Sequence, residues 1–256
     1  MNKKIILFIG AGESSTFMYN GLKDDYSISS VVMEGKISRK NFIKRRIKRL
    51  GYLKVIGQLL FQLIIPKLLL FNSQKRINEI KENYNLDTTP IPCSVIKEVP
   101  SINSNECIEF LKKEKPDLII VNGTGIISKK VLNCINTTFI NTHAGITPKY
   151  RGVHGGYWAM ANQDKGNCGV TVHFVDSGID TGRVLFQKNI TPISKDNFVT
   201  YTYLQIGEGI KIIKRAITDF IDDQLKSIEP QVKESKLWYH PTIWFYLYKR
   251  LTKGVK

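Results

Sequence analysis

Cysteine and histidine are scarce in this chain, and neither residue forms a pattern that would hold a metal. Only four of each occur among 256 residues. Cys93, Cys107, Cys134 and Cys168 are scattered, with no CxxC pair and no close histidine, whereas zinc sites need ligands clustered at short spacings. We therefore predict reduced, buried cysteines and no bound metal.

A long uninterrupted apolar run is also missing. The most hydrophobic stretch, residues 59–71, is broken by polar residues and a proline, and it is shorter than the roughly 20 apolar residues that a bilayer-spanning helix requires. The N-terminus lacks the pattern of a secretory leader, because the apolar run after Lys4 already ends at Gly10. The sequence therefore predicts a cytoplasmic protein.

Acidic residues are absent between Gly35 and Asn78, although the whole chain carries a formal charge of +16. Because this stretch combines many basic residues with the apolar run, we interpret residues 36–71 as a basic helical insertion. Three interpretations are open: a solvated basic helix followed by a packed helix, an amphipathic patch at the inner face of an anionic membrane, or a nucleic-acid surface. Nucleic acid is the least favoured, because no recognised nucleic-acid module accompanies the charge.

Apolar runs rich in branched residues alternate with segments of helical periodicity along residues 1–225. This alternation predicts an α/β fold with a Rossmann-like, mostly parallel twisted sheet and helices on both faces. Strands are predicted at 5–9, 28–33, 91–94, 118–121, 137–141, 169–175 and 183–190, and helices after Glu13 and at 73–84, 105–113, 153–162 and 197–222. The last two strands resemble a hairpin, so we expect the sheet to become mixed at that end.

Residues 226–256 differ in character from the main domain, which we assign to residues 1–225. They hold an aromatic segment, residues 237–248, flanked by basic side chains. We predict a short C-terminal extension, for which three roles are open: covering the core, forming a dimer contact, or meeting a membrane. A homodimer is the assembly that we predict.

A glycine-rich turn follows the first predicted strand and opens a helix. Backbone N–H groups at such a place can bind a phosphate. The turn residues concerned are Gly10, Gly12, Glu13 and Ser14. Glu34 stands where a ribose-binding acid would stand in an NAD-binding protein, but Ser15 replaces the third glycine of the dinucleotide pattern. A substrate phosphate, a purely structural turn and NAD are the three open interpretations.

The most informative pattern is an apolar strand that delivers Asn141 and His143 to a loop rich in glycine and proline. Residues two apart on a strand share one face, so these two side chains can converge on one substrate atom. A second loop, residues 175–182, can bring Asp180 or its rival Asp176 beside them. An amide, an imidazole and a carboxylate together suit acyl transfer through a negatively charged oxygen.

Asn141-x-His143, the loop 148–152 and the segment Ile179-Asp180-Thr181-Gly182 resemble the active-site signature of tetrahydrofolate-dependent formyltransferases. The resemblance is strongest from about residue 117 to residue 187. It implies that Asn141 and His143 stabilise the oxyanion, that Asp180 orients His143 and carries protons, and that N10-formyltetrahydrofolate is the co-substrate.

The same resemblance implies positions for the two substrates. The folate donor would contact Gly123, Thr124, Gly125, Ile126, Ile127, Asp176 and Gly178, and the glycine turn, residues 10–14, would meet a phosphate of the acceptor. The basic loop beside His143 is either solvated or positions an anionic acceptor. We therefore add Lys149, Tyr150, Arg151 and His154 as candidates for binding the acceptor, whereas we expect His173 to face the sheet or the core.

We predict transfer of a formyl group to the amine of a nucleotide-linked amino sugar, on a pathway to surface polysaccharide. Three features favour this acceptor: residues 144–148 depart from the Ser-Leu-Leu-Pro form of many relatives, the chain is short beyond its core for a methionyl-tRNA formyltransferase, and its basic and aromatic segments suit a membrane surface. The alternatives are formylation of methionyl-tRNA, hydrolysis of formyltetrahydrofolate and, outside the family, an NAD(P)-dependent sugar-nucleotide oxidoreductase.

Overall fold

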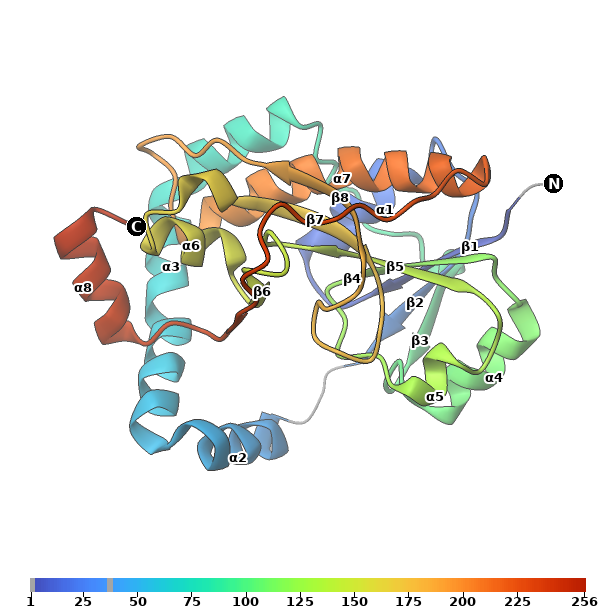
Figure 1. The fold of residues 1–256 in the computed structure, drawn as a ribbon, viewed down its shortest axis with the longest axis horizontal. Helices are drawn as coiled ribbons and strands as arrows, with labels where there is room; N and C mark the ends of the chain where they lie inside the picture. Colours follow the sequence, from blue (N-terminus) through green and yellow to red (C-terminus); the bar gives the residue numbers. More distant parts are fainter. Residues whose placement is uncertain (1–2, 36–38) are drawn as a thin grey trace.

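A seven-stranded sheet forms the centre of the computed structural model, which describes residues 3–35 and 39–256. The strands lie in the order β3-β2-β1-β4-β5-β7-β8 (Figure 1). Their bounds are β1 Ile5–Ile9, β2 Ile28–Glu34, β3 Ile96–Val99, β4 Leu118–Asn122, β5 Thr138–His143, β7 Gly169–Phe174 and β8 Val184–Asn189. Strands β1 to β5 are parallel and β7 runs antiparallel to β5, which confirms the predicted α/β fold and its mixed end.

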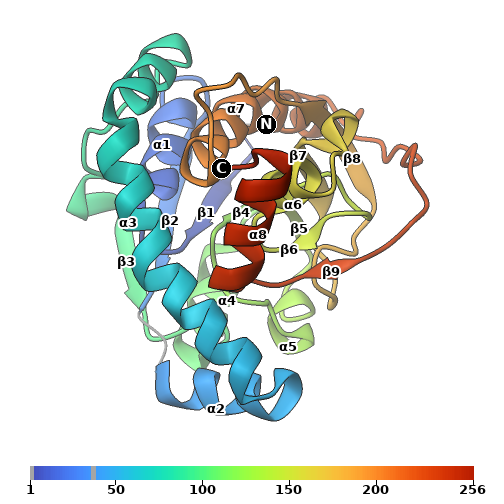
Figure 2. The same cartoon turned by 90° about the vertical axis from the view of Figure 1, so that its left-hand side faces the viewer.

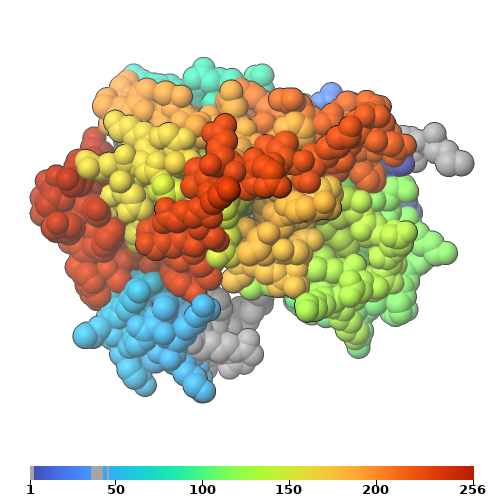
Figure 3. Space-filling model, viewed as in Figure 1, coloured from blue at the N-terminus to red at the C-terminus, as the bar shows by residue number. Residues whose placement is uncertain are grey.

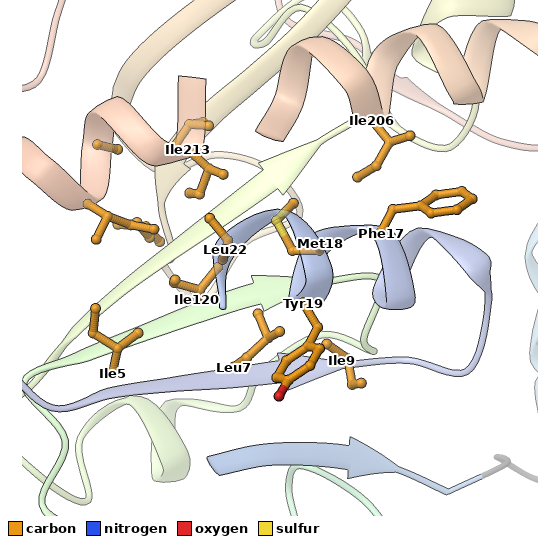
Figure 4. Packing of buried hydrophobic residues seen from close by; sticks show 14 of the residues in the cluster. Ile5, Leu7, Ile9, Phe17, Met18, Tyr19, Leu22, Ile120, Ile206 and Ile213 are labelled. Carbon is orange, nitrogen blue, oxygen red and sulfur yellow. The ribbon is translucent and has the colours of Figure 1, made fainter. Parts of the chain in front are cut away.

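Helices cover both faces of this sheet. Helices α1 Glu13–Leu22 and α7 Phe198–Ile221 lie on one face, and helices α4 Asn105–Glu114 and α5 Lys129–Leu132 lie on the other. The remaining helices are α2 Arg39–Leu50, α3 Tyr52–Asn83, α6 Gly155–Ala161 and α8 Ile243–Lys253. Alternate side chains of β1 point to opposite layers, with Leu7 packed among residues of α1 and α7, and Phe8 among residues of α4 and α5. Figure 4 shows the first layer, in which Met18 and Leu22 of α1 lie close to Leu7.

The first and fourth strands explain why the sequence shows continuous apolar runs. Every residue of β1 and β4 is buried, because both strands lie inside the sheet and are covered on both faces. One strand was predicted too early, at residues 91–94. The structure has a 3₁₀ turn at Cys93–Val95 followed by β3, because Pro90 and Pro92 cannot donate the hydrogen bonds of a strand ladder.

The predicted basic insertion corresponds to α2 and the first part of α3, while its residues 36–38 lie outside the described part of the chain. Helix α3 continues through Pro66, so the separate helix predicted at 73–84 is the end of the same element. Its inner side chains Phe61, Ile65 and Leu69 pack in a cluster with residues of α6, α7 and α8. Among the described residues, α3 alone has the length and hydropathy that a membrane crossing would require, and 33% of its most apolar window is buried.

The C-terminal segment crosses the surface and covers part of the core (Figures 2 and 3). Its short strand β9, Leu237–Trp238, pairs in parallel with β6, Arg151–Gly152. The indole of Trp238 stacks on Trp158, with 4.5 Å between ring centroids, and α8 places Tyr246 in the cluster with α3 and α6. Covering the core is therefore a role of this segment, whereas the domain boundary at residue 225 stays a prediction.

Candidate functional site

The side chains singled out by the sequence meet where β5 ends beside β7. Asn141 and His143 lie two residues apart on β5, and Asn141 is directly opposite His173 of β7. The loop from β7 to β8, gold in Figure 1, extends away from the sheet and brings Asp180 to both histidines. The structure thus brings together the three predicted side chains and adds His173 to them.

His143 is buried, and both of its ring nitrogens face an acceptor. Nε2 lies 2.7 Å from the Tyr150 carbonyl oxygen, which can only accept, so Nε2 carries the proton. Nδ1 then presents its lone pair to Asp180 Oδ2, 3.3 Å away. Burial lowers the pKa of His143, although the Asp180 charge and the Tyr150 carbonyl act in the opposite direction. A neutral imidazole therefore faces a carboxylate across a gap that can hold one proton.

Asp180 is fixed by its backbone and by its partners. Its φ of 51° lies in the left-handed region, which aspartate adopts more readily than most residues. Oδ2 accepts a hydrogen bond of 2.8 Å from the Gly152 N–H, and Oδ1 lies 3.7 Å from His173 Nε2. Burial raises the pKa of Asp180, but His143, whenever it is protonated, and the hydrogen bond from the Gly152 N–H lower it more strongly. The group is therefore ionised at neutral pH.

His173 holds the amide of Asn141, a role that the sequence prediction missed. Nδ1 of His173 lies 2.7 Å from the Phe174 carbonyl oxygen and must donate to it, so Nε2 accepts the 3.2 Å hydrogen bond from Asn141 Nδ2. The amide keeps a second N–H for a substrate oxygen. The sequence signal for this contact was the mixed end of the sheet, which the expected hairpin of β7 and β8 predicts. An antiparallel β7 beside β5 can place residue 173 opposite residue 141.

Replacing His173 with leucine should lower kcat about tenfold and change KM little, because Asn141 loses the acceptor that orients it. His173→Gln should restore part of the rate, since its amide can also accept a hydrogen bond. Steady-state kinetics of His173→Leu, of Asn141→Ala and of the double variant measure this coupling, and His173→Gln is assayed beside them. Full additivity of the two changes in the double variant would show that His173 does not act through Asn141.

The predicted donor-binding residues lie in two loops beside this group. Gly123 has φ 70°, Ile126 exposes 58% of its surface, and the Thr124 hydroxyl bonds the Gly125 carbonyl, whereas Ile127 is buried in the core cluster beneath β4. Only the first part of this loop therefore presents side chains outward. The role of the loop in binding folate stays a prediction.

Glu34 connects the loop after β4 to residues 101 and 102, which follow β3. Its carboxylate accepts hydrogen bonds from the Gly125 N–H, the Ser101 hydroxyl and the Ile102 N–H. A carboxylate already engaged by three protein donors is not free to bind the ribose of a dinucleotide. The structure therefore gives no support to the NAD alternative.

Asp176 shapes the second loop and does not reach the histidines. Its Oδ1 accepts hydrogen bonds from the Gly178 N–H, at 2.9 Å, and from the Thr181 hydroxyl, at 2.6 Å, and the side chain is exposed. Of the two rival carboxylates, Asp180 is therefore the one that faces His143. The loop ends at Gly182. Only glycine fits at this position, because a Cβ there would lie 1.6 Å from the Phe174 carbonyl oxygen.

The glycine turn is packed closely against the end of β4. A Cβ on Gly10 would lie 2.1 Å from the Gly123 carbonyl oxygen, and Gly12 has φ 154°. The Glu13 carboxylate is bound by Lys81 and Tyr203, so its side chain is directed to α3 and α7, whereas Ser14 is exposed. Phosphate binding by this turn stays a prediction that concerns Gly12 and Ser14 more than the Glu13 side chain.

The basic loop differs from the prediction at two of its aromatic positions. Tyr150 is buried, with its hydroxyl on Asp164 and its ring stacked on Trp238, because an aromatic ring is more stable in this cluster than in water. His154 bonds His240 at 2.9 Å and packs on Phe198. Their side chains therefore serve packing in this structure.

The two charged residues of the loop have separate positions. Lys149 pairs with Asp164 at 2.7 Å and lies 3.7 Å from Glu234. The Arg151 guanidinium donates to the Ile179 carbonyl, next to Asp180. Of the two charged side chains, Arg151 therefore lies nearer the proposed chemistry. Within residues 3–35 and 39–256, no group of three or more His, Cys, Asp or Glu side chains is arranged to hold a metal.

A model of the formyl transferase family matches residues 74–216, which include every residue of the site from β4 to the Asp180 loop. The chain therefore belongs to the formyl transferase family. Members of this family are folate-dependent formyl transfer enzymes, and N10-formyltetrahydrofolate is their formyl donor.

Individual relatives agree with this membership. Methionyl-tRNA formyltransferase of Clostridium tetani is 36% identical over 143 residues, 52% of this chain and 42% of that protein, so the match spans less than half of that relative. A sugar N-formyltransferase from a Shewanella species has a TM-score of 0.55 at 13% identity, over 91% of this chain and 75% of the other. Phosphoribosylglycinamide formyltransferase from Anaplasma phagocytophilum has a TM-score of 0.59 at 13% identity, over 92% and 96%, and both structures show the same fold.

Proposed function

We propose that this protein is an N-formyltransferase that moves a formyl group from N10-formyltetrahydrofolate to the amine of a nucleotide-linked amino sugar. The observation that carries the proposal is the grouping of Asn141, His143 and Asp180 within the segment that matches the family. The reaction joins the amine nitrogen to the formyl carbon and breaks the bond from that carbon to the folate nitrogen. The amine loses one proton, and the folate nitrogen gains one.

The geometry supports a division of labour in this reaction. Asn141 donates its second N–H to the formyl oxygen as negative charge develops there, and a fixed amide serves this purpose without titrating. The predicted oxyanion role of His143 differs from its position, because its N–H is bonded to the Tyr150 carbonyl. His143 and Asp180 instead form a pair that accepts the proton of the attacking amine between Nδ1 and Oδ2 and passes it to the leaving nitrogen.

The residues around Asn141, His143 and Asp180 fit a folate donor. The donor supplies an activated formyl carbon, and its flat pterin ring suits an apolar contact such as the exposed Ile126. Gly123 and Gly178 leave the two loop backbones open to a ring lying between them. Replacing Gly178 would disturb the second loop itself, since a Cβ there would lie 1.9 Å from the Thr181 hydroxyl oxygen.

The amino-sugar acceptor is supported by two features. The loop Ala144-Gly145-Ile146-Thr147-Pro148 departs from the Ser-Leu-Leu-Pro form of many relatives, and the structural neighbours include a sugar N-formyltransferase. Arg151, Gly12 and Ser14 are the residues that we propose for its phosphates. A nucleotide-linked acceptor and a folate donor suit a cytoplasmic enzyme, and the homodimer stays a prediction.

Formylation of methionyl-tRNA is the second candidate. Curated relatives such as those of Clostridium tetani and Thermotoga maritima are methionyl-tRNA formyltransferases, and the formal charge of +16 would favour a polyanionic partner. A tRNA acceptor predicts tight binding at low salt that weakens steeply as salt rises.

The deciding experiment offers N10-formyltetrahydrofolate with a panel of nucleotide-linked amino sugars and, separately, with methionyl-tRNA. We expect a product one formyl group heavier from an amino sugar, and none from the matching sugar whose amine is already acetylated. Formylated methionyl-tRNA would establish the second candidate instead. Formate released at the same rate with no acceptor would identify a hydrolase.

A further inference from the structure

One outer face of the molecule is apolar, and no part of the described chain covers it. It consists of exposed side chains of α3 and α8, which we call the apolar platform. The platform residues are Tyr52, Leu53, Ile56, Leu60, Leu63, Ile64, Leu68 and Phe71 of α3, and Trp244, Leu247, Tyr248 and Leu251 of α8. Phe71 and Leu251 are 83% and 84% exposed. Contiguous apolar surface of this kind marks an interaction site.

The two helices form a single surface. The Trp244 ring lies on Gly57 of α3, where a Cβ would come within 2.2 Å of it. A pocket of about 650 Å³ between the helices is lined by Leu53, Lys54, Thr242, Trp244, Phe245 and Tyr248. Figure 2 views the molecule from this side, with α3 and α8 both in front of the sheet. The platform therefore continues from one helix to the other.

The orientation of α3 is fixed by its opposite side. Phe61, Ile65 and Leu69 are buried, and they alternate with the platform residues at helical spacing. Arg76 near the C-terminal end of α3 pairs with the buried Asp196 at 2.9 Å. A helix held along one side in this way can lie on a bilayer but cannot cross it without leaving the domain.

The charged residues of α8 and of α3 as far as Asn78 have one sign. No acidic residue occurs from Gly35 to Asn78 or from Ser235 to Lys256. Lys54, Lys67 and Lys253 are exposed, and none of them pairs with an acid in the described parts of the chain. Long lysine side chains beside buried aliphatic groups can reach the phosphates of lipid headgroups.

We propose that the apolar platform docks on an anionic lipid bilayer, with α3 and α8 lying in the headgroup region and the lysines on lipid phosphates. Two copies paired through this face would bring basic side chains against basic side chains. A nucleic acid would leave the leucines without an apolar partner. The proposal concerns the location of the protein and does not depend on the identity of its acceptor.

Sedimentation with vesicles tests the proposal. We expect the wild-type chain to bind vesicles of phosphatidylcholine with phosphatidylglycerol, and to bind phosphatidylcholine alone about tenfold more weakly. Leu63→Glu and Leu251→Glu should each weaken binding about tenfold or more, because each places a charge where an apolar side chain enters the bilayer. The control Ile228→Glu alters a side chain of similar chemistry, 48% exposed, beside β8, and should bind as wild type.

Two further readouts decide between occupants. Quenching of Trp244 fluorescence by brominated lipid should occur in the wild type and disappear in Trp244→Phe, because Trp158 is buried and Trp238 is half-buried against it. Equal binding of wild type and both glutamate variants would overturn the proposal. So would a wild-type dimer that ignores vesicles and becomes a monomer in Leu63→Glu, which would make the platform an interface between copies.

Discussion

Replacing Asp180 with asparagine should lower kcat for formyl transfer by about 10²- to 10⁴-fold, the usual contribution of a positioned proton-transfer group. The carboxylate lies 3.3 Å from His143 Nδ1, and an amide there would offer neither the charge nor the shared proton. Asparagine tolerates the left-handed φ of 51°, and its oxygen can still accept from the Gly152 N–H. The fold should therefore survive the change.

Asp176→Asn is the matched control for this variant. It makes the same substitution four residues upstream in the same loop and keeps the oxygen that bonds Gly178 and Thr181. We expect less than a tenfold effect, seen mainly in KM for the folate donor. Steady-state kinetics and urea unfolding of both variants measure the comparison. If Asp180→Asn retains most of the wild-type kcat with an unchanged fold, its carboxylate does not move the proton.

Lowering the pH from 7 to 4 should reduce the free energy of unfolding by about 3 kcal/mol or more through the pair His154 and His240. Burial, with the second ring close by, lowers the pKa of His154 to about 3, and burial with the charge of Arg46 lowers the pKa of His240 to about 4. Both values lie below the ordinary 6.5, so the unfolded chain binds these protons first. This stabilisation is complete above about pH 6.5 and is lost as the pH falls towards the folded-state values.

The variant His240→Gln removes one titrating ring and keeps a side chain that can hydrogen-bond His154. Its unfolding free energy should fall less steeply between pH 6.5 and pH 4 than that of the wild type, as measured by urea titration at each pH. The lowered pKa of His143 makes stability fall over the same range in both proteins, and the lowered pKa of Asp180 does so only below its ordinary value of 3.8, so the difference between the two curves reports the change at His240. Parallel curves for the two proteins would contradict the assignment to this pair.

Local patterns were sufficient to predict the sheet. The runs at β1 and β4 are apolar because both faces are covered, and a residue pair two apart on β5 needs only strand periodicity to share a face. The prediction was weaker where a single residue opposes the surrounding pattern. Residues 73–84 were predicted as a separate helix, yet they are the end of α3, which continues through Pro66 because the packing of Phe61, Ile65 and Leu69 outweighs one missing hydrogen bond.

Partners that are distant in the sequence explain what could not be predicted in the site. The hydrogen bond of His143 to the Tyr150 carbonyl depends on the path of a loop. The hydrogen bond between Asn141 and His173 depends on which strands are neighbours in the sheet. Tyr150 looked like a substrate contact because it lies between two basic residues. Its burial required Trp238 to arrive from the C-terminal segment, and sequence spacing says nothing of that contact.

The pairing of β6 with β9 limits how the site can adapt to a substrate. The N–H groups of Arg151 and Val153 donate to the Lys236 and Trp238 carbonyls, while Gly152 between them donates to Asp180. The backbone of residues 151–153 is therefore held in place by β9, and it does not behave as a lid. We expect any adjustment to fall to the exposed turn at residues 176–178, because its hydrogen bonds are short-range and can break without disturbing the sheet.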